Sequence, residues 1–243
     1  MTYCVALRLD KGLVFMSDTR TNAGVDDIAQ VKKMHSWEVP GERVFTLLSA
    51  GNLATTQAVI SLIDERSKAP EDRNPSVLKA PSMFQIASII GNTLREVVKN
   101  FEPSGPAAES VFGATLILGG QIKGSEPRLF MIYPEGNFIE SSADNPFFQT
   151  GETKYGRPIL VRALSADTSF ANAVKLLCVS FDSTIRANLS VDLPLDLQVL
   201  ALNECKITHQ RRFERHDPYF QKVSRGWSDA LRDALNALPD FSF

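Results

Sequence analysis

Cysteine and histidine are scarce in this 243-residue chain, which has three of each. The cysteines are far apart and form no C-x-x-C pair, which is typical of reduced thiols in a cytoplasm and not of a disulfide framework. The histidines form no H-E-x-x-H motif and have no cysteine at zinc spacing, so we expect no metal site and no cofactor. These absences argue against a metalloenzyme and against a disulfide-stapled secreted protein.

Long apolar runs and an excess of one charge are missing as well. No stretch approaches the ~18 apolar residues of a membrane span. The N-terminus has no basic segment followed by an apolar one, so we expect no signal peptide. Lysine and arginine number 26 against 28 aspartate and glutamate residues, a net charge of −2. This balance excludes a strongly basic nucleic-acid-binding protein and intrinsic disorder. We therefore expect a globular cytoplasmic protein that binds neither nucleic acid nor membrane.

The hydrophobic pattern predicts strands and helices in alternating blocks. Period-two alternation from Tyr3 to Asp10 predicts a strand, and the Lys11-Gly12 turn joins it to a second strand in a hairpin. The other expected strands are Val31–Val39, Arg43–Ser49, Val111–Gly119, Arg128–Tyr133, Phe138–Glu140 and Leu195–Leu202. The expected helices begin at Gly51, run through Ala87–Phe101, and lie near 154–164, 169–188 and Trp227–Leu238. This order predicts a mixed α/β (α+β) fold, a four-layer αββα sandwich of two antiparallel sheets in a single domain, residues 1–243.

Thr2 is the first candidate catalytic residue. Initiator methionine is normally removed before a small residue such as threonine, which would leave a free α-amine on Thr2. Such an amine has a pKa of about 7.7–8.0 and can accept the proton of the threonine's own hydroxyl. An ordinary N-terminus is the alternative, because many chains begin with Met-Thr.

Asp18 and Lys33 can activate such a nucleophile. Asp18 ends the second expected strand, and Lys33 lies on the third. If the three strands are neighbours, the lysine ammonium favours the alkoxide and the carboxylate holds the ammonium. Lys32 is the alternative lysine, but alternation along a strand puts the two lysines on opposite faces, and we choose Lys33. A turn aspartate and a solvated lysine are the alternative interpretations.

Gly51 is a candidate oxyanion donor. It lies in Ser49-Ala50-Gly51-Asn52, where a strand is expected to lead into a helix. A backbone amide at a helix N-terminus can donate to an oxyanion. The alternative is a glycine selected there for its backbone freedom.

Together these residues resemble the proteasome-type N-terminal nucleophile hydrolases, and most closely a bacterial branch of that family. The similarity covers essentially the whole chain, and it is strongest in Ser17–Asp26, Val39–Val44, Ala50–Gln57 and Ser180–Thr184. It implies the four-layer sandwich. It also implies a nucleophile, an activating pair and an oxyanion amide, which would be Thr2, Asp18 with Lys33, and Gly51.

Two segments depart from the family pattern. Proteasome β subunits carry a serine in a glycine-containing loop where this chain has Gln149–Glu152. Their Arg-Asp-x-x-Ser motif corresponds to Arg186–Ser190, in which alanine replaces the aspartate. The resemblance makes Ser190 a site residue, but the group that orients the Thr2 amine stays open, with Asp182 as one alternative.

These observations predict a self-assembling threonine hydrolase of peptide or other amide bonds. The alternatives are a catalytically weak or inactive assembly subunit with the same fold and an amidase for a small substrate. The sequence identifies neither the substrate nor an unfoldase partner.

A homo-oligomer is expected, because the resemblance implies a ring-like or open spiral assembly. The helix through Ala87–Phe101 supports this expectation, since four apolar residues fall outside its apolar stripe and would face neighbouring subunits. These residues are Phe84, Ile86, Ile89 and Val98.

Overall fold

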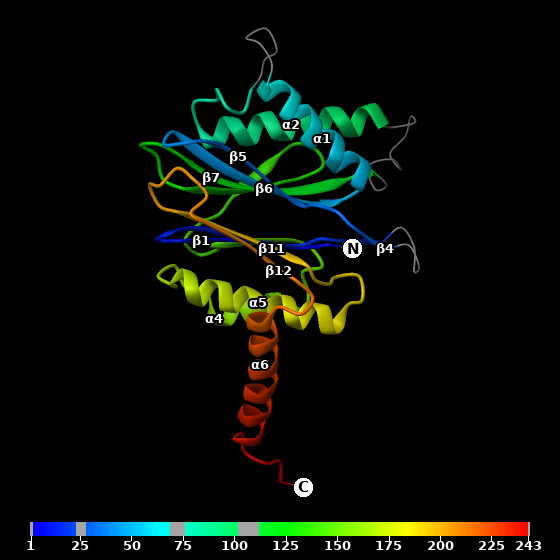
Figure 1. Cartoon of the computed structure of the whole chain (residues 1–243), viewed down its shortest axis with the longest axis vertical. Helices are drawn as coiled ribbons and strands as arrows, with labels where there is room; N and C mark the ends of the chain where they lie inside the picture. Colours follow the sequence, from blue (N-terminus) through cyan, green and yellow to red (C-terminus); the bar gives the residue numbers. More distant parts are fainter. Residues whose placement is uncertain (1, 23–27, 69–75, 102–111, 243) are drawn as a thin grey trace.

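Two five-stranded antiparallel sheets lie face to face between two layers of helices (Figure 1). The structure is a computed structural model that describes residues 2–22, 28–68, 76–101 and 112–242. The layer order confirms the four-layer αββα sandwich that the order of elements predicts.

The first sheet contains the N-terminal hairpin and has the order β10-β1-β2-β11-β12. Its strands are β1 (Tyr3–Leu9), β2 (Gly12–Asp18), β10 (Phe147–Gly151), β11 (Leu195–Ala201) and β12 (His209–Phe213). The sequence pattern misses β10 and β12. β12 is exposed at four of its five residues, and β10 is buried at all but its last residue, so neither alternates between buried and exposed positions.

The second sheet has the order β5-β6-β7-β8-β9. Its strands are β5 (Met34–Val39), β6 (Arg43–Gly51), β7 (Ala114–Ile122), β8 (Arg128–Ile132) and β9 (Phe138–Glu140). The strand expected from Val31 begins only at Met34, so Lys33 precedes it. β5 belongs to the sheet opposite β1 and β2. The expectation that these three strands are neighbours is therefore wrong. A separate two-stranded sheet, β3 (Arg20–Asn22) and β4 (Ile28–Gln30), lies between β2 and β5 in the chain.

Gly119 and Gly120 lie inside β7, which continues three residues beyond the expected strand end at Gly119. A Cβ atom on Gly119 would lie 2.7 Å from the Phe15 ring, and one on Gly120 would lie 2.4 Å from the Phe45 Cβ. The two glycines therefore make room for large side chains of the core.

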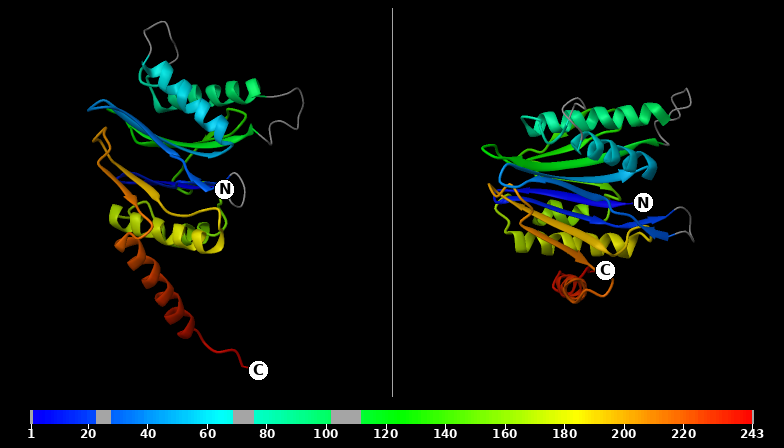
Figure 2. Two further views of the ribbon diagram at one scale, coloured as in Figure 1. Left: turned by 45° about the vertical axis from the view of Figure 1, so that its right-hand side comes forward. Right: turned by 45° about the horizontal axis from the view of Figure 1, so that its top comes forward.

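The helices cover the outer faces of the two sheets. α1 (Leu53–Lys68) and α2 (Met83–Phe101) cover the second sheet, and α4 (Arg157–Ala163) and α5 (Phe170–Ala187) cover the first. α6 (Pro218–Asn236) extends away from the α4 and α5 layer (Figure 2). It begins nine residues before the expected Trp227, because Asp217 caps the Phe220 N–H at 3.0 Å and a proline occupies the first turn. Among the described residues, no helix has both the length and the apolar character needed to cross a bilayer.

Three apolar layers hold the sandwich together. One lies between α1, α2 and the second sheet, one between the two sheets, and one between the first sheet, α4 and α5. Phe15 and Leu48 are fully buried between the sheets. Each such side chain contributes about 1.5–3 kcal/mol by leaving water, which fixes the two sheets face to face.

The assembly surface expected on α2 is largely internal to the subunit. Ile86 and Val98 are buried, and Ile89 is partly buried against the same core. Only Phe84 is exposed, at 52%. The expectation fails because α2 packs against α1 as well as against its sheet, so two of its sides are covered.

Candidate active site

The start of β1 opens into a cavity of about 410 Å³. Thr2 lines this cavity together with Lys33 and with residues from the end of β6 and the first turns of α1. Thr2 immediately precedes β1 and is partly exposed. Met1, whose removal the sequence predicts, lies outside the described residues.

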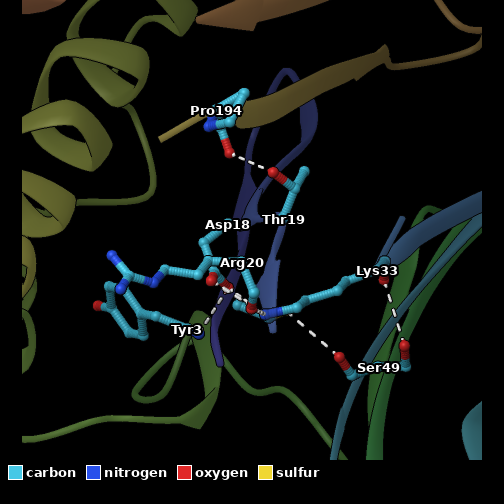
Figure 3. A network of polar contacts seen from close by, with 8 residues as sticks. Tyr3, Asp18, Thr19, Arg20, Lys33, Ser49 and Pro194 are labelled. Carbon is cyan, nitrogen blue, oxygen red and sulfur yellow. Dashed lines mark hydrogen bonds and ion pairs between the residues drawn. The ribbon is translucent and has the colours of Figure 1, made fainter. Parts of the chain in front are cut away.

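Lys33 and Asp18 form a buried ion pair beside this cavity (Figure 3). The lysine Nζ donates to both carboxylate oxygens of Asp18 at 2.9 Å. Asp18 is fully buried and Lys33 is 5% exposed, whereas Lys32 is exposed. The structure therefore brings the expected lysine and aspartate together, although from opposite sheets.

The Lys33 backbone is anchored on the second sheet, and its side chain crosses to the first. Its carbonyl accepts the Ser49 N–H of β6 at 3.0 Å. Besides the two oxygens of Asp18, its ammonium donates to the Arg20 carbonyl. These three acceptors match the three N–H groups of the ammonium. An ammonium with all three N–H groups engaged can act on a charge in the cavity through its field and not through a spare donor.

Burial dominates the electrostatics of Asp18. Loss of water raises the pKa of its carboxyl to about 6, although the Lys33 ammonium and the Tyr3 N–H, which donates to Oδ1 at 2.9 Å, both favour the ionised form. Burial likewise raises the pKa of the Cys4 thiol, which is fully enclosed between the sheets. Cys4 is thus a packed thiol and not a second nucleophile.

Gly51 closes β6 and lines the same cavity as Thr2. Its φ of +118° favours glycine, and a Cβ atom here would lie 2.5 Å from the Gly113 carbonyl oxygen. α1 begins two residues later, where the Asn52 side chain accepts the Thr55 N–H at 3.1 Å. The positive end of the α1 dipole therefore reaches the cavity, which suits an anionic oxygen near Gly51.

Hydrogen bonds among the described residues link Ser190 to Thr2 through two other residues. The Ser190 backbone N–H donates to the Asn188 side chain at 2.9 Å, and that side chain donates to a Glu152 carboxylate oxygen at 2.8 Å. The Glu152 backbone N–H in turn donates to the Thr2 carbonyl at 2.7 Å. The sequence reasoning did not select Glu152 or Asn188, although it named the segments Gln149–Glu152 and Arg186–Ser190 that contain them, because only the fold shows that these segments meet beside Thr2.

Asp182, the alternative carboxylate, has a different partner. It accepts a hydrogen bond from Arg186, one helical turn away on α5, at 3.1 Å. Arg186 also donates to Ser224 of α6 at 3.0 Å. This pair connects α5 to α6, and the structure gives it no contact with Thr2.

Two further polar contacts hold the chain that follows Asp18 in place. The Thr19 hydroxyl donates to the Pro194 carbonyl at 2.9 Å (Figure 3). Arg20 pairs with Asp192 at 3.2 Å. These contacts fix the end of β2 and so the position of Asp18. Among the described residues, no group of three or more His, Cys, Asp or Glu side chains is placed to hold a metal ion.

Solved structures identify the relatives of this fold and site. Anbu (ancestral beta-subunit) from Yersinia bercovieri is 45% identical, with full coverage of both chains and a TM-score of 0.92. Anbu from Hyphomicrobium sp. strain MC1 is 50% identical, again over both full lengths, with a TM-score of 0.91. The chain belongs to the Anbu family. No protein-family model and no curated protein sequence matches it.

One Anbu structure also describes an assembly. The helical assembly of the Anbu complex from Pseudomonas aeruginosa contains a chain that is 44% identical to this one, with a TM-score of 0.92. The alignment covers 99% of this chain and 98% of that one. The Anbu fold thus extends over the whole chain, including the segments that carry Thr2, Asp18, Lys33 and Gly51.

Proposed function

We propose that this chain is a self-assembling, proteasome-like threonine hydrolase of peptide or other amide bonds, with its nucleophile exposed by removal of Met1. The observation that carries the proposal is the cavity at which Thr2, Lys33 and Gly51 meet. A hydroxyl nucleophile, a buried ammonium and a backbone amide at a helix start are the groups that acyl transfer requires.

In the first half of the reaction, the Thr2 Oγ attacks the amide carbonyl and its proton passes to the free α-amine of Thr2, directly or through one water. The field of Lys33 lowers the cost of negative charge on Oγ, and Asp18 keeps the ammonium in place. The Gly51 N–H donates to the oxyanion. Collapse breaks the C–N bond, and the terminal ammonium returns the proton to the leaving amine.

In the second half, water attacks the resulting acyl-ester on Thr2. The α-amine takes a proton from this water, the same oxyanion site holds the tetrahedral intermediate, and the ester C–O bond breaks. The terminal ammonium returns its proton to the Thr2 Oγ, which restores the hydroxyl and the free amine, and the acid product leaves.

Two alternatives each have an observation in their favour. Ala187 stands at the end of α5 where the family motif has a carboxylate, which favours an assembly subunit with weak or no catalysis. The cavity of about 410 Å³ is in the size range of small-molecule sites, which favours an amidase for a small substrate.

Self-assembly is supported by the apolar side of α6. Among the residues of this helix only Phe220 is buried, while Leu231 and Leu235 are 50% and 68% exposed. Beyond the helix, Leu238 and Phe241 are also exposed. So much apolar surface on one projecting element is typical of a protein interface.

The apolar side of α6 continues into a groove on the body of the subunit. This groove has a volume of about 970 Å³ and is lined by residues of α4, α5 and the loop between them, with Trp227 and Leu231 of α6. A neighbouring copy that covers the groove would bury the base of α6 at the same time. We propose a homo-oligomer, ring-like or an open spiral, in which this region contacts a neighbour.

A cytoplasmic location is part of the proposal. Cys4, Cys178 and Cys205 are all free and buried, which supports a reducing compartment. Fractionation of the native host with an antibody against the chain tests this location.

The experiment that tests the function is covalent trapping of Thr2. A peptide epoxyketone reacts with both the hydroxyl and the free amine of an N-terminal threonine. Intact-mass analysis of protein from its native host should show loss of Met1, and peptide mapping should then show the adduct on Thr2. Retention of Met1 throughout would rule out the terminal-amine mechanism.

Thr2→Ala is the matched control. Because Thr2 is partly exposed, this variant should fold and assemble as the parent does. It should form no adduct and hydrolyse no amide. A Met1-free parent that folds, assembles and still takes up no label would leave the assembly subunit as the better account.

A further inference from the structure

Glu152 lies directly opposite Thr2 on the edge of β1 that faces β10. Tyr3 pairs with Gly151 at the end of the two strands, so the next position pairs Thr2 with Glu152. The Glu152 N–H donates to the Thr2 carbonyl at 2.7 Å. In a hydrogen-bonded antiparallel pair, the nitrogen and the carbonyl of a residue both point to the partner strand. The Thr2 nitrogen is therefore directed toward the backbone carbonyl of Glu152, the residue that also carries the carboxylate.

Gly151 makes this close approach possible. Its φ is +85°, and a Cβ atom on it would lie 1.9 Å from the Thr2 carbonyl oxygen. Any side chain at this position would push the end of β10 away from Thr2. The chain thus holds Glu152 against Thr2, the residue before β1, by a backbone contact that only glycine allows.

The Glu152 carboxylate is enclosed but keeps acceptor capacity. The residue is 8% exposed. One carboxylate oxygen accepts the Asn188 amide at 2.8 Å and the other accepts the Lys154 backbone N–H at 3.2 Å. A carboxylate offers about four acceptor positions. Within the described part of the chain, both donors to Glu152 are neutral, and a buried carboxylate is costly without a cation.

We propose that Glu152 is the positioning residue for the α-amine of Thr2 once Met1 is removed, with Asn188 holding its carboxylate in place. The inference rests on the proposed terminal-amine mechanism and assigns the group that orients the amine. In this arrangement one N–H of the amine donates to Glu152, and the nitrogen lone pair takes the proton of the Thr2 hydroxyl. The ammonium so formed lies beside a carboxylate until it gives its proton to the leaving amine.

In this arrangement Ser190 acts on Glu152 indirectly, through Asn188. Its backbone N–H fixes the Asn188 side chain, and Asn188 fixes Glu152. α5 ends at Ala187, with Asn188 as its C-cap, and neither residue carries a charge. The carboxylate beside Thr2 therefore comes from the end of β10 and not from α5.

The test measures the protonation of the Thr2 amine directly. Periodate cleaves the 1,2-amino alcohol of an N-terminal threonine only when the amine is unprotonated. The full-length chain is prepared with Thr2 as its first residue, and the cleavage rate is followed by intact mass as a function of pH. A carboxylate partner raises the pKa of an amine, so Glu152→Gln should lower the midpoint of this profile by about one pH unit.

Glu126→Gln is the matched control, because Glu126 is an exposed glutamate in the turn between β7 and β8. Its profile should coincide with that of the parent. The other titratable groups near the amine are Asp18, Lys33 and, around the cavity, Lys32 and His35. All four are the same in every variant, so the difference reports Glu152.

Asn188→Ala provides an independent second variant, which keeps the test decisive if Glu152→Gln does not fold. It should lower the midpoint by a smaller amount, because Glu152 loses one of its two donors. An unchanged midpoint in the folded variants would overturn the inference. Glu152→Gln could lower the midpoint relative to the parent while the parent itself hydrolyses no amide. That result would support the role of Glu152 and count against the proposed hydrolase.

Discussion

Lys33 and Lys32 are adjacent in the sequence but occupy different environments. Lys33 is buried and paired with Asp18, whereas Lys32 is exposed at the cavity. Lys33→Ala should therefore lower the rate of amide hydrolysis by at least ~10²-fold, the low end for loss of an electrostatic stabiliser. Lys32→Ala should cost far less. Steady-state rates of the two variants at equal protein concentration check this prediction, and a more sensitive Lys32 would contradict the assignment.

The protonation of Asp18 predicts how the rate depends on pH. Burial raises the pKa of Asp18 to about 6, so the carboxyl is ionised above this pH and neutral below it. The Thr2 amine must also be unprotonated, and its pKa is ~8 without a charged partner and about one unit higher beside Glu152. Between pH 8 and 6 the logarithm of the rate should fall with slope one, from the amine alone. Below pH 6 the slope should rise to two, because the neutral carboxyl releases Lys33.

Initial rates from pH 5 to 8 check this profile, with circular dichroism to confirm that the fold persists. Asp18→Asn should lose the break near pH 6, since it has no group to protonate there. A parent slope that stays at one down to pH 5 would show that the Asp18 charge is not required.

At the scale of elements, the junction of β6 and α1 holds Gly51 in a strained position. Gly51→Ala should destabilise the protein by at least ~2 kcal/mol, because it combines a φ of +118° with a contact of 2.5 Å to the Gly113 carbonyl oxygen. Gly124→Ala is the control, since Gly124 also has a positive φ but no atom within 4 Å of the added Cβ. It should cost about 1 kcal/mol.

Urea unfolding of both variants measures this difference as a shift in midpoint. Equal midpoints for the two variants would mean that the end of β6 moves away from Gly113 at little cost. That result would remove the rigid position on which the role of Gly51 as an oxyanion donor depends.

At the scale of the whole molecule, α6 is a helix whose apolar side the rest of the subunit leaves exposed. Leu231 lies on its apolar side, and Asn236 is its last, polar residue. Leu231→Glu should disrupt assembly by placing a charge in a buried interface, while Asn236→Glu adds the same charge elsewhere and should not. The parent should have a mass well above that of a dimer.

Light scattering coupled to size exclusion measures these masses at several concentrations. A parent mass of one subunit at every concentration would refute self-assembly. If Leu231→Glu assembled like the parent, a surface other than α6 would have to hold the subunits together.

The sequence by itself predicts the layers of this protein and the chemistry of its first residues. Alternation in β1 and β2 and the apolar stripe of α2 follow from local periods, which is why the sandwich could be predicted. Thr2 was selectable as the small residue after Met1, and Asp18 and Lys33 from their places at the end of the second expected strand and in the third. Their catalytic roles stay predictions.

Only the tertiary structure decides which residues from distant segments come into contact. It places Asp18 at the end of β2 and Lys33 just before β5 of the facing sheet, where the sequence argument required neighbouring strands. It packs Ile86 and Val98 of α2 inside the subunit, where the apolar pattern suggested a contact with another subunit. Such contacts depend on which faces of the sheets and helices pack together. The hydrophobic period of one segment does not show which other segment it packs against.

Glu152 illustrates this limit most clearly. It is separated from Thr2 by 149 intervening residues, and its strand lacks the alternation that marks a strand in the sequence. Its position beside Thr2 follows from the pairing of β10 with β1 and from the backbone of Gly151. The sequence determines the residue types available to the site. The long-range strand pairing, stabilised by burial of both sheets, determines which residues lie beside Thr2.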